Sequence, residues 1–186
     1  MRKYDFYKLI KEELKNGSSD LVTRQSGQMI RSRIEVDIAK EENGAVIAFD
    51  FSKVGIIDYS CADEIVAKLM SRLLGGEYGN RYFILTGLSD SQEENIEVAL
   101  ERKGLAIAAE KRNGEKILLG SLNNYLKETL DLIIKEGRLT AKELSQVMNL
   151  EANTSGTRLL NLHKKRLVKR IEETREGGRV WVYESL

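Results

Sequence analysis

The sequence has almost none of the features that mark an exported or membrane protein. Cysteine occurs once, as Cys61, so no disulfide can form within the chain, and this scarcity fits a reducing compartment. No stretch comes near the ~18 consecutive apolar residues of a membrane span. Residues 1–15 lack the apolar core and the small-residue cleavage site of a signal peptide. We therefore expect a cytoplasmic protein that has no membrane partner.

Residues typical of catalysis are equally scarce. The one histidine, His163, lies about a hundred residues from Cys61, and nothing brings the two within the hydrogen-bond distance that a nucleophile and its base require. No Cys and His residues have zinc spacing, and residues 75–79 lack the Gly-Lys-Ser/Thr of a phosphate-binding loop. Asp50 and Asp58 could form an acidic metal or phosphoacceptor site, but two aspartates near strand ends are common by chance. We expect no enzyme activity, no catalytic residue, no metal ion and no cofactor.

Charge is distributed unevenly along the chain. Residues 1–120 carry 18 Lys and Arg against 20 Asp and Glu, a net charge of −2, whereas residues 121–186 carry 12 against 9, a net charge of +3. Residues 153–170 contain no acid and six bases, which are Arg158, Lys164, Lys165, Arg166, Lys169 and Arg170. Such asymmetry suggests a polyanionic partner for the C-terminal part. The alternative is an ordinary solvated helix face.

The first two thirds of the sequence alternate between strand and helix patterns. Residues 45–51 and 81–86 are apolar runs of strand length, as expected of strands covered on both faces. Helical patterns occupy residues 6–14, 27–39, 58–74 and 91–102, and shorter strand patterns occupy residues 105–109 and 116–119. This order predicts an α/β domain over residues 21–120, with largely parallel pairing and right-handed crossovers. Residues 1–20 are assigned to an N-terminal helix and linker.

Two of these helices have finer patterns. Met29, Ile30 and Ile34 are assigned to the apolar face of the helix over residues 27–39. Ser91 and Glu94 have the spacing of a capping box.

Residues 121–186 have a different pattern, which predicts a second domain. A helix beginning near Leu122 ends at Gly137, and Thr140 with Glu143 forms a capping box that opens a short helix with Leu144, Val147 and Met148 inward. Asn153 or Thr154 can cap a third helix that runs to about residue 165. Strands over residues 167–174 and 179–184 follow, joined by a tight turn around residues 176–178.

This C-terminal pattern resembles the winged-helix regulators of bacteria and archaea. The likeness rests on residues 139–148 (LTAKELSQVM), residues 154–170 (TSGTRLLNLHKKRLVKR) and the Gly-Gly pair at residues 177–178. The sequence departs from that pattern at Arg166, where these proteins often have glycine at the end of the recognition helix. The resemblance implies that the third helix enters the major groove of double-stranded DNA. A homodimer is expected where an operator is palindromic.

Helical spacing separates the third helix into two faces. Ser155, Leu159 and Leu162 can face the core, which leaves polar and basic side chains on the outside. Thr, Asn and Arg hydrogen-bond to base edges or phosphates, and Lys neutralises phosphate. The candidate DNA-binding residues are Thr154, Thr157, Arg158, Asn161, Lys164, Lys165, Lys169 and Arg170, with Arg175 and Arg179 beside the hairpin turn. Three acids argue against DNA contact by the hairpin, because the carboxylates of Glu172, Glu173 and Glu176 would repel phosphate.

The N-terminal pattern resembles STAS-type domains, the fold of anti-sigma-factor antagonists. The matching stretches are residues 23–27 (TRQSG), 49–54 (FDFSKV) and 58–64 (DYSCADE). The resemblance implies that Ser60, at a helix start, is phosphorylated by a partner kinase, and that Tyr59, Asp58 and Asp63 border a site for a regulatory kinase or ATPase. The chain departs from the family at Tyr59 and Cys61. The alternative is that Asp58 or Ser60 is only an N-cap and that Asp63 and Glu64 favour the first turn.

Together these patterns predict a STAS-like α/β domain followed by an α+β winged-helix domain over residues 121–186. The expected function is a DNA-binding transcriptional regulator whose first domain senses a partner or signal. The alternative is a partner-switching interaction scaffold whose winged helix makes protein contacts.

Overall fold

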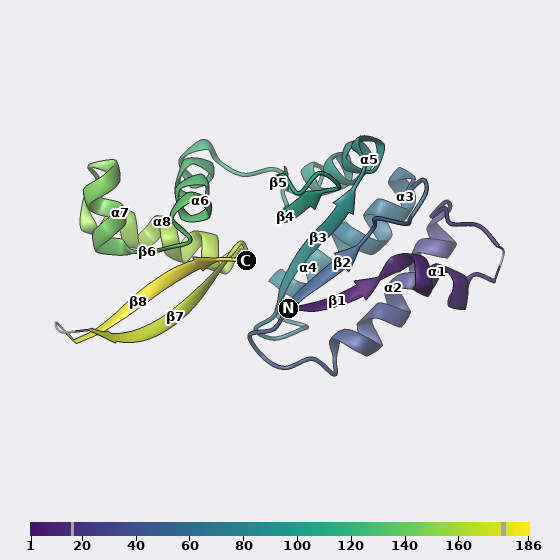
Figure 1. Cartoon of the computed structure of the whole chain (residues 1–186), viewed down its shortest axis with the longest axis horizontal. Coiled ribbons are helices and arrows are strands. Elements are labelled where there is room, and N and C mark those ends of the chain that lie inside the picture. Colours follow the sequence, from purple (N-terminus) through teal and green to yellow (C-terminus); the bar gives the residue numbers. More distant parts are fainter. Residues whose placement is uncertain (16, 176–177) are drawn as a thin grey trace. The chain divides into compact units, whose positions relative to one another are not determined.

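The computed structural model describes residues 1–15, 17–175 and 178–186. The chain is mixed α/β and divides into two compact units, Met1–Ser121 and Leu122–Leu186 (Figure 1). No helix within the described residues is long and apolar enough to cross a membrane.

Unit 1 is built on a five-stranded mixed sheet with the strand order β1-β2-β3-β4-β5. The first four strands are parallel, and β5 is antiparallel to β4. The strands are β1 (Arg2–Asp5), β2 (Val46–Asp50), β3 (Tyr82–Leu88), β4 (Ala106–Lys111) and β5 (Lys116–Gly120). Each parallel strand lies next to the one before it in sequence, and Figure 1 shows β1 and β5 at opposite edges of the sheet.

The helices of unit 1 fill the crossovers between these strands. They are α1 (Phe6–Glu13), α2 (Arg24–Ile38), a continuous helical stretch made of α3 (Tyr59–Ala62), the π-helical turn η1 (Asp63–Ala67) and α4 (Lys68–Leu74), and α5 (Asp90–Glu101). The stretch from α3 to η1 packs between α2 and α5. Aromatic rings anchor the core, since Phe6 stacks on Phe51 at 4.5 Å between ring centroids and Phe49 lies 5.1 Å from Phe83.

Unit 1 confirms the predicted strands and helices but differs at its N-terminus. Residues 1–20 do not form a separate segment, because β1 pairs in parallel with β2 and α1 buries Phe6 and Ile10 in the core of the unit. The four residues of β1 are too few to show a period, and the helical pattern that follows without a turn hides the strand.

The prediction for α2 was confirmed for Ile30 and Ile34 and wrong for Met29, and the predicted capping box of α5 was wrong. Met29 is 43% exposed, because α2 begins at Arg24 under the Thr23 cap and turns Gly27, Ile30, Ile34 and Ile38 inward. The capping box of α5 is formed by Ser89 and Gln92 rather than by Ser91 and Glu94. Gln92 is favoured there because its buried amide also donates to the carbonyls of Val54 and Gly55.

Unit 2 places three helices against a three-stranded antiparallel sheet of order β6-β8-β7. Its elements are α6 (Asn124–Glu136), β6 (Arg138–Thr140), α7 (Ala141–Met148), α8 (Ala152–Lys164), β7 (Val168–Arg175) and β8 (Gly178–Ser185). The three-residue strand β6 was not predicted. Residues 176–177 of the predicted hairpin turn lie outside the described residues.

The ends of these helices agree only in part with the predictions. The capping box of Thr140 and Glu143 is present, and α6 ends at Gly137. The N-cap of α8 is Glu151, so Asn153 and Thr154 lie inside the first turn rather than capping it. Val147 is 62% exposed instead of inward.

Arg166 follows α8 with a φ of +61°, in the left-handed region that glycine adopts without strain. The turn holds this geometry through bonds from Arg166 N to the His163 carbonyl and from Leu167 N to the Leu162 carbonyl. A left-handed conformation costs a residue with a Cβ about 1 kcal/mol. At this position the chain therefore differs from glycine in residue type but has a backbone conformation that glycine favours.

We expect Arg166→Gly to stabilise unit 2 by up to about 1 kcal/mol, because glycine removes the left-handed strain. Chemical denaturation of the full chain, with Arg166→Ala as the control, measures the effect. Alanine also loses the side chain but keeps the strain. Equal stability of the glycine and alanine variants would contradict the prediction.

Candidate functional site

Helix α8 has a buried face and an exposed face, as predicted. Ser155, Leu159 and Leu162 are fully buried, and α8 packs against α6 and α7. At about 100° per residue, Thr157, Asn161 and Lys164 lie opposite this buried face. The six candidate residues Thr154, Thr157, Arg158, Asn161, Lys164 and Lys165 are called the α8 surface below.

Tyr125 of α6 joins the α8 surface. The Arg158 guanidinium lies 5.3 Å from the centroid of the Tyr125 ring and donates to the Tyr125 carbonyl oxygen at 3.3 Å. These two residues, with Asn153, Thr154, Thr157 and Asn161, line a shallow depression of about 360 Å³. Tyr125 was not among the candidate DNA-binding residues identified from the sequence. The structure leaves it 41% exposed, and its spacing alone did not reveal this.

The lysines of the α8 surface have no carboxylate partner. Lys164 is exposed and Lys165 is half-buried, and neither forms an ion pair within residues 1–15, 17–175 and 178–186. The same holds for Arg158 and for Lys169, at the start of β7. Their positive charge is therefore available to an external anion.

The hairpin cations are placed differently. Arg175 forms ion pairs with Glu143 at 3.2 Å and Glu173 at 3.3 Å, and Arg179 lies 3.8 Å from Glu172. These carboxylates offset the positive charges of Arg175 and Arg179, which the sequence predicted to contact DNA from the hairpin. The Arg170 guanidinium lies 3.8 Å from the centroid of the Trp181 ring, and Arg170 does not line the depression formed by the α8 surface.

His163 adds no charge to α8 near neutral pH. Burial lowers the pKa of its imidazole, and the nearby Arg166 and Arg170 lower it further. Its Nδ1 lies 3.4 Å from the Val168 carbonyl oxygen, so the ring connects the end of α8 to β7.

In unit 1, Asp58 caps the helix that carries Ser60. Its Oδ1 accepts hydrogen bonds from Cys61 N at 2.7 Å and from Ser60 Oγ at 2.9 Å, and its Oδ2 accepts one from Thr23 N at 3.0 Å. Burial alone would raise the pKa of Asp58, but these hydrogen bonds hold it below its ordinary value. Asp58 is thus the N-cap, and it also holds the start of α2 against α3.

The neighbours of Ser60 are half-buried or buried. The Tyr59 ring lies under the Arg102 guanidinium, 4.7 Å from it. The Cys61 thiol donates to the Thr23 carbonyl oxygen at 2.8 Å, and burial raises its pKa to about 12. Cys61 therefore remains a neutral thiol rather than a reactive thiolate.

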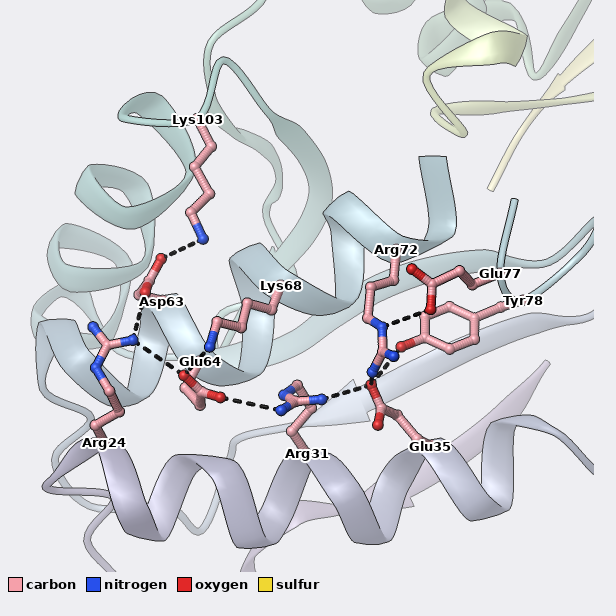
Figure 2. Close-up of polar contacts among 10 residues, drawn as sticks. All are labelled: Arg24, Arg31, Glu35, Asp63, Glu64, Lys68, Arg72, Glu77, Tyr78 and Lys103. Carbon is pink, nitrogen blue, oxygen red and sulfur yellow. Dashed lines mark hydrogen bonds and ion pairs between the residues drawn. The ribbon is translucent and has the colours of Figure 1, made fainter. Parts of the chain in front are cut away.

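Asp63 and Glu64 form the centre of a buried charge network (Figure 2). They lie on the π-helical turn and are only 6% and 1% exposed. Arg24 Nη1 contacts Asp63 at 3.0 Å and Glu64 at 3.1 Å, and Lys103 contacts Asp63 at 2.6 Å. The two acids lie in the first turn of η1 rather than in the first turn of α3, and their partners are Arg24, Arg31, Lys68 and Lys103.

The network continues along α2 from Glu64. Arg31 contacts Glu64 at 3.2 Å and Glu35 at 2.9 Å, and Lys68 contacts Glu64 at 2.5 Å. Glu35 also accepts hydrogen bonds from Arg72 and from the Tyr78 hydroxyl. Figure 2 shows these side chains bridging α2 and the helix that carries η1.

The cations keep these carboxylates ionised. Burial would raise the pKa values of Asp63 and Glu64, but Lys103 and Arg24 lower that of Asp63, and Lys68 and Arg31 lower that of Glu64. Asp50 is engaged elsewhere, with Lys3 at 2.9 Å. Among the described residues, no group of three or more His, Cys, Asp and Glu side chains could hold a metal ion.

We expect Glu64→Gln to destabilise unit 1 by about 2 kcal/mol at neutral pH, because it removes the charge of a buried carboxylate and takes one of two carboxylate partners from the largely buried Arg31. Glu77→Gln is the control. Glu77 is half-exposed and pairs with Arg72, and its loss should cost about 0.5 kcal/mol or less. Chemical denaturation measures both.

The Glu64 contribution should also depend on pH. Because the folded-state pKa is lowered, the stabilisation is present above the ordinary Glu value of 4.5 and is lost as pH falls below it. The gap between wild type and Glu64→Gln should therefore narrow in acid. A gap that is absent at neutral pH, or that widens in acid, would refute the role of this network.

Comparison with protein-family models finds no match for this sequence, and comparison with curated proteins finds none either. The chemistry of the α8 surface and of the Asp58–Ser60 helix start is therefore the basis for assigning a function.

Proposed function

We propose that the chain is a DNA-binding transcriptional regulator, in which unit 2 is a winged-helix module and unit 1 is a STAS-like domain that senses a partner. One observation carries the proposal. Helix α8 buries its apolar face and presents three cations, Arg158, Lys164 and Lys165, that have no carboxylate partner in the described part of the chain, beside hydrogen-bonding Thr and Asn side chains. This is the chemistry that recognition of duplex DNA requires.

The architecture of unit 2 supports this proposal. Three helices followed by a hairpin is the order that the resemblance implies, and α6, α7, α8, β7 and β8 follow it. The short strand β6, which pairs with β8, is an addition to that order. A recognition helix must be rigidly mounted to place side chains in the major groove. The full burial of Leu159 and Leu162 provides that mounting.

The contacts of Arg158 give it a special place in the interface. Its stacking on Tyr125 and its bond to the Tyr125 carbonyl hold the guanidinium before any DNA binds. A preordered side chain loses less entropy on binding. We assign base-edge or phosphate contact to Arg158, Thr157 and Asn161, and phosphate neutralisation to Lys164 and Lys165.

The hairpin contributes less under this proposal. Arg175 and Arg179 are paired with carboxylates, and Glu172 and Glu173 lie on the same hairpin. Carboxylates beside a phosphate backbone repel it, so α8 should supply most of the affinity.

Fluorescence anisotropy of the full chain on a random duplex, titrated with salt, tests the proposal. With Arg158, Lys164 and Lys165 as phosphate contacts, log K should fall against log salt with a slope of about −3, from roughly −0.9 per contact. Lys164→Ala with Lys165→Ala should reduce the slope by about 2.

The control is Lys127→Ala with Lys135→Ala, which removes the same charge from exposed positions of α6. It should leave the slope nearly unchanged. Equal effects of the two double variants would mean that binding follows net charge and not the α8 surface. Absence of binding at low salt would refute DNA binding and favour the alternative, an interaction scaffold in which unit 2 contacts protein.

The partner-sensing role of unit 1 rests on the start of α3. Tyr59 and Ser60 are half-exposed. Two cations lie nearby, since Arg102 contacts the Tyr59 ring and Arg24 contacts Asp63 on the following turn. A phosphate on Ser60 would replace the hydroxyl that donates to Asp58 and would set two anions side by side. Phosphorylation would thus disrupt the cap that joins α2 to α3.

We expect candidate kinases to produce a shifted band of the full chain on a phosphate-affinity gel, and Ser60→Ala to abolish it. Thr23→Ala is the control, because it removes a hydroxyl at the neighbouring cap of α2. A shift that survives in Ser60→Ala, or no shift with any kinase, would leave Ser60 with only its hydrogen bond to the capping Asp58.

A further inference from the structure

Unit 2 contains a groove outside the α8 surface, and two of its lining residues, Arg170 and Arg175, were among the candidate DNA contacts. It lies between the start of α7, one side of α8 and the β7–β8 hairpin, and it has a volume of about 780 Å³. We call it the hairpin groove. Its size falls within the range of roughly 300–1,000 Å³ that is usual for small-molecule sites.

The walls of the hairpin groove are largely apolar and aromatic. Leu160 of α8, Ala141 of α7 and Val180 of β8 line it, together with Trp181 and Tyr183. Trp181 is the one tryptophan of the chain and is 45% exposed, although tryptophan is usually well buried. Such a surface favours a flat apolar group, since aromatic rings stack with offset faces.

Two cations that line the groove, Arg170 and the exposed Lys142, have no anionic partner among the described residues, and Arg170 is the one that lies against the aromatic wall. The Arg170 guanidinium lies 3.8 Å from the centroid of the Trp181 ring and 5.9 Å from that of Tyr183. Its Nε is buried and meets no hydrogen-bond acceptor among the described residues. A buried donor without an acceptor is costly, so an acceptor from outside the chain would relieve it.

Glu143, the acid that lines the groove, already has partners within the chain. Glu143 accepts hydrogen bonds from Thr140 N at 2.7 Å and Thr140 Oγ1 at 2.8 Å, and it pairs with Arg175 at 3.2 Å. These contacts hold the pKa of Glu143 below its ordinary value, so it stays a carboxylate bound within the chain. The positive charge left to be complemented in the groove is therefore that of Arg170, on the aromatic wall, and of the exposed Lys142.

We propose that the hairpin groove binds a small aromatic carboxylate, with its ring against Trp181 and Leu160 and its carboxylate on Arg170. A planar guanidinium matches a planar carboxylate in a two-bond arrangement. Charge complementarity selects an anion, and the apolar walls select one that carries a single charge on a hydrophobic body. Binding of the carboxylate in the groove does not depend on whether the chain binds DNA.

The test is titration of the full chain with para-tert-butylbenzoate and with the matching neutral amide, followed by calorimetry and by the fluorescence of Trp181. The carboxylate should bind saturably and about ten-fold or more tightly than the amide, because its bonds to Arg170 are charge-assisted. Equal affinity for acid and amide, or no saturable binding of either at millimolar concentration, would overturn the proposal.

Two variants locate the site. Arg170→Lys keeps the charge but lacks the planar fork, and it should lose most of the preference for the acid. Arg179→Lys, on the same hairpin but outside the groove lining, should bind as wild type does. Thermal unfolding of both variants establishes that they are folded, and retention of full preference in a folded Arg170→Lys would refute the assignment.

A consequence for regulation rests on the proposed function. Gly156 and Leu160 of α8 line the groove, and both lie within a turn of Thr157 and Asn161 of the α8 surface. An anion held there should weaken DNA binding by wild type and leave the Arg170→Lys variant unaffected. If the ligand binds but DNA affinity does not change, only this regulatory link fails. If no DNA binds at all, the groove titration still stands by itself.

Discussion

Burial of Leu159 and Leu162 determines how α8 is oriented, and the candidate functions of unit 2 depend on that orientation. Both side chains are fully buried against neighbouring helices, so the helix cannot rotate without exposing them to water. Once they are inside, the period of the helix places Thr157 and Asn161 outside. The same rotation turns Leu160 toward the hairpin groove. One packing constraint thus produces a polar surface on one side and an apolar wall on the other.

Charge pairing divides the cations of the chain by role. In unit 1, Arg24 and Arg31 are matched to buried carboxylates and hold α2 to the π-helical turn. In unit 2, the hairpin cation Arg175 is matched to Glu143, whereas Lys164 has no such partner in the described part of the chain. A paired cation contributes to the fold, and an unpaired cation at the surface can attract an external anion. The net charge of the whole chain, +1, does not reveal this division between paired and unpaired cations.

Much of the architecture could be predicted because it follows from local patterns. The apolar runs of β2 and β3, the Thr140 capping box and the buried face of α8 each depend on residues close in sequence. Prediction failed where distant residues decided the outcome. Strand β1 exists because β2 offers it an edge, and the cap of α5 forms at Gln92 because the carbonyls of Val54 and Gly55 accept its amide protons.

The sequence by itself determined which side chains α8 exposes, because a helix has a fixed period and its apolar residues must be buried. It also determined where the basic residues are concentrated. Only the tertiary structure decided which of those bases remain unpaired, since the carboxylate beside Arg175 comes from α7, about thirty residues away in sequence. It likewise set Arg170 over Trp181 and Tyr125 beneath Arg158. Ion pairs and ring contacts depend on distances of a few ångströms in space, and spacing along the chain does not contain that information.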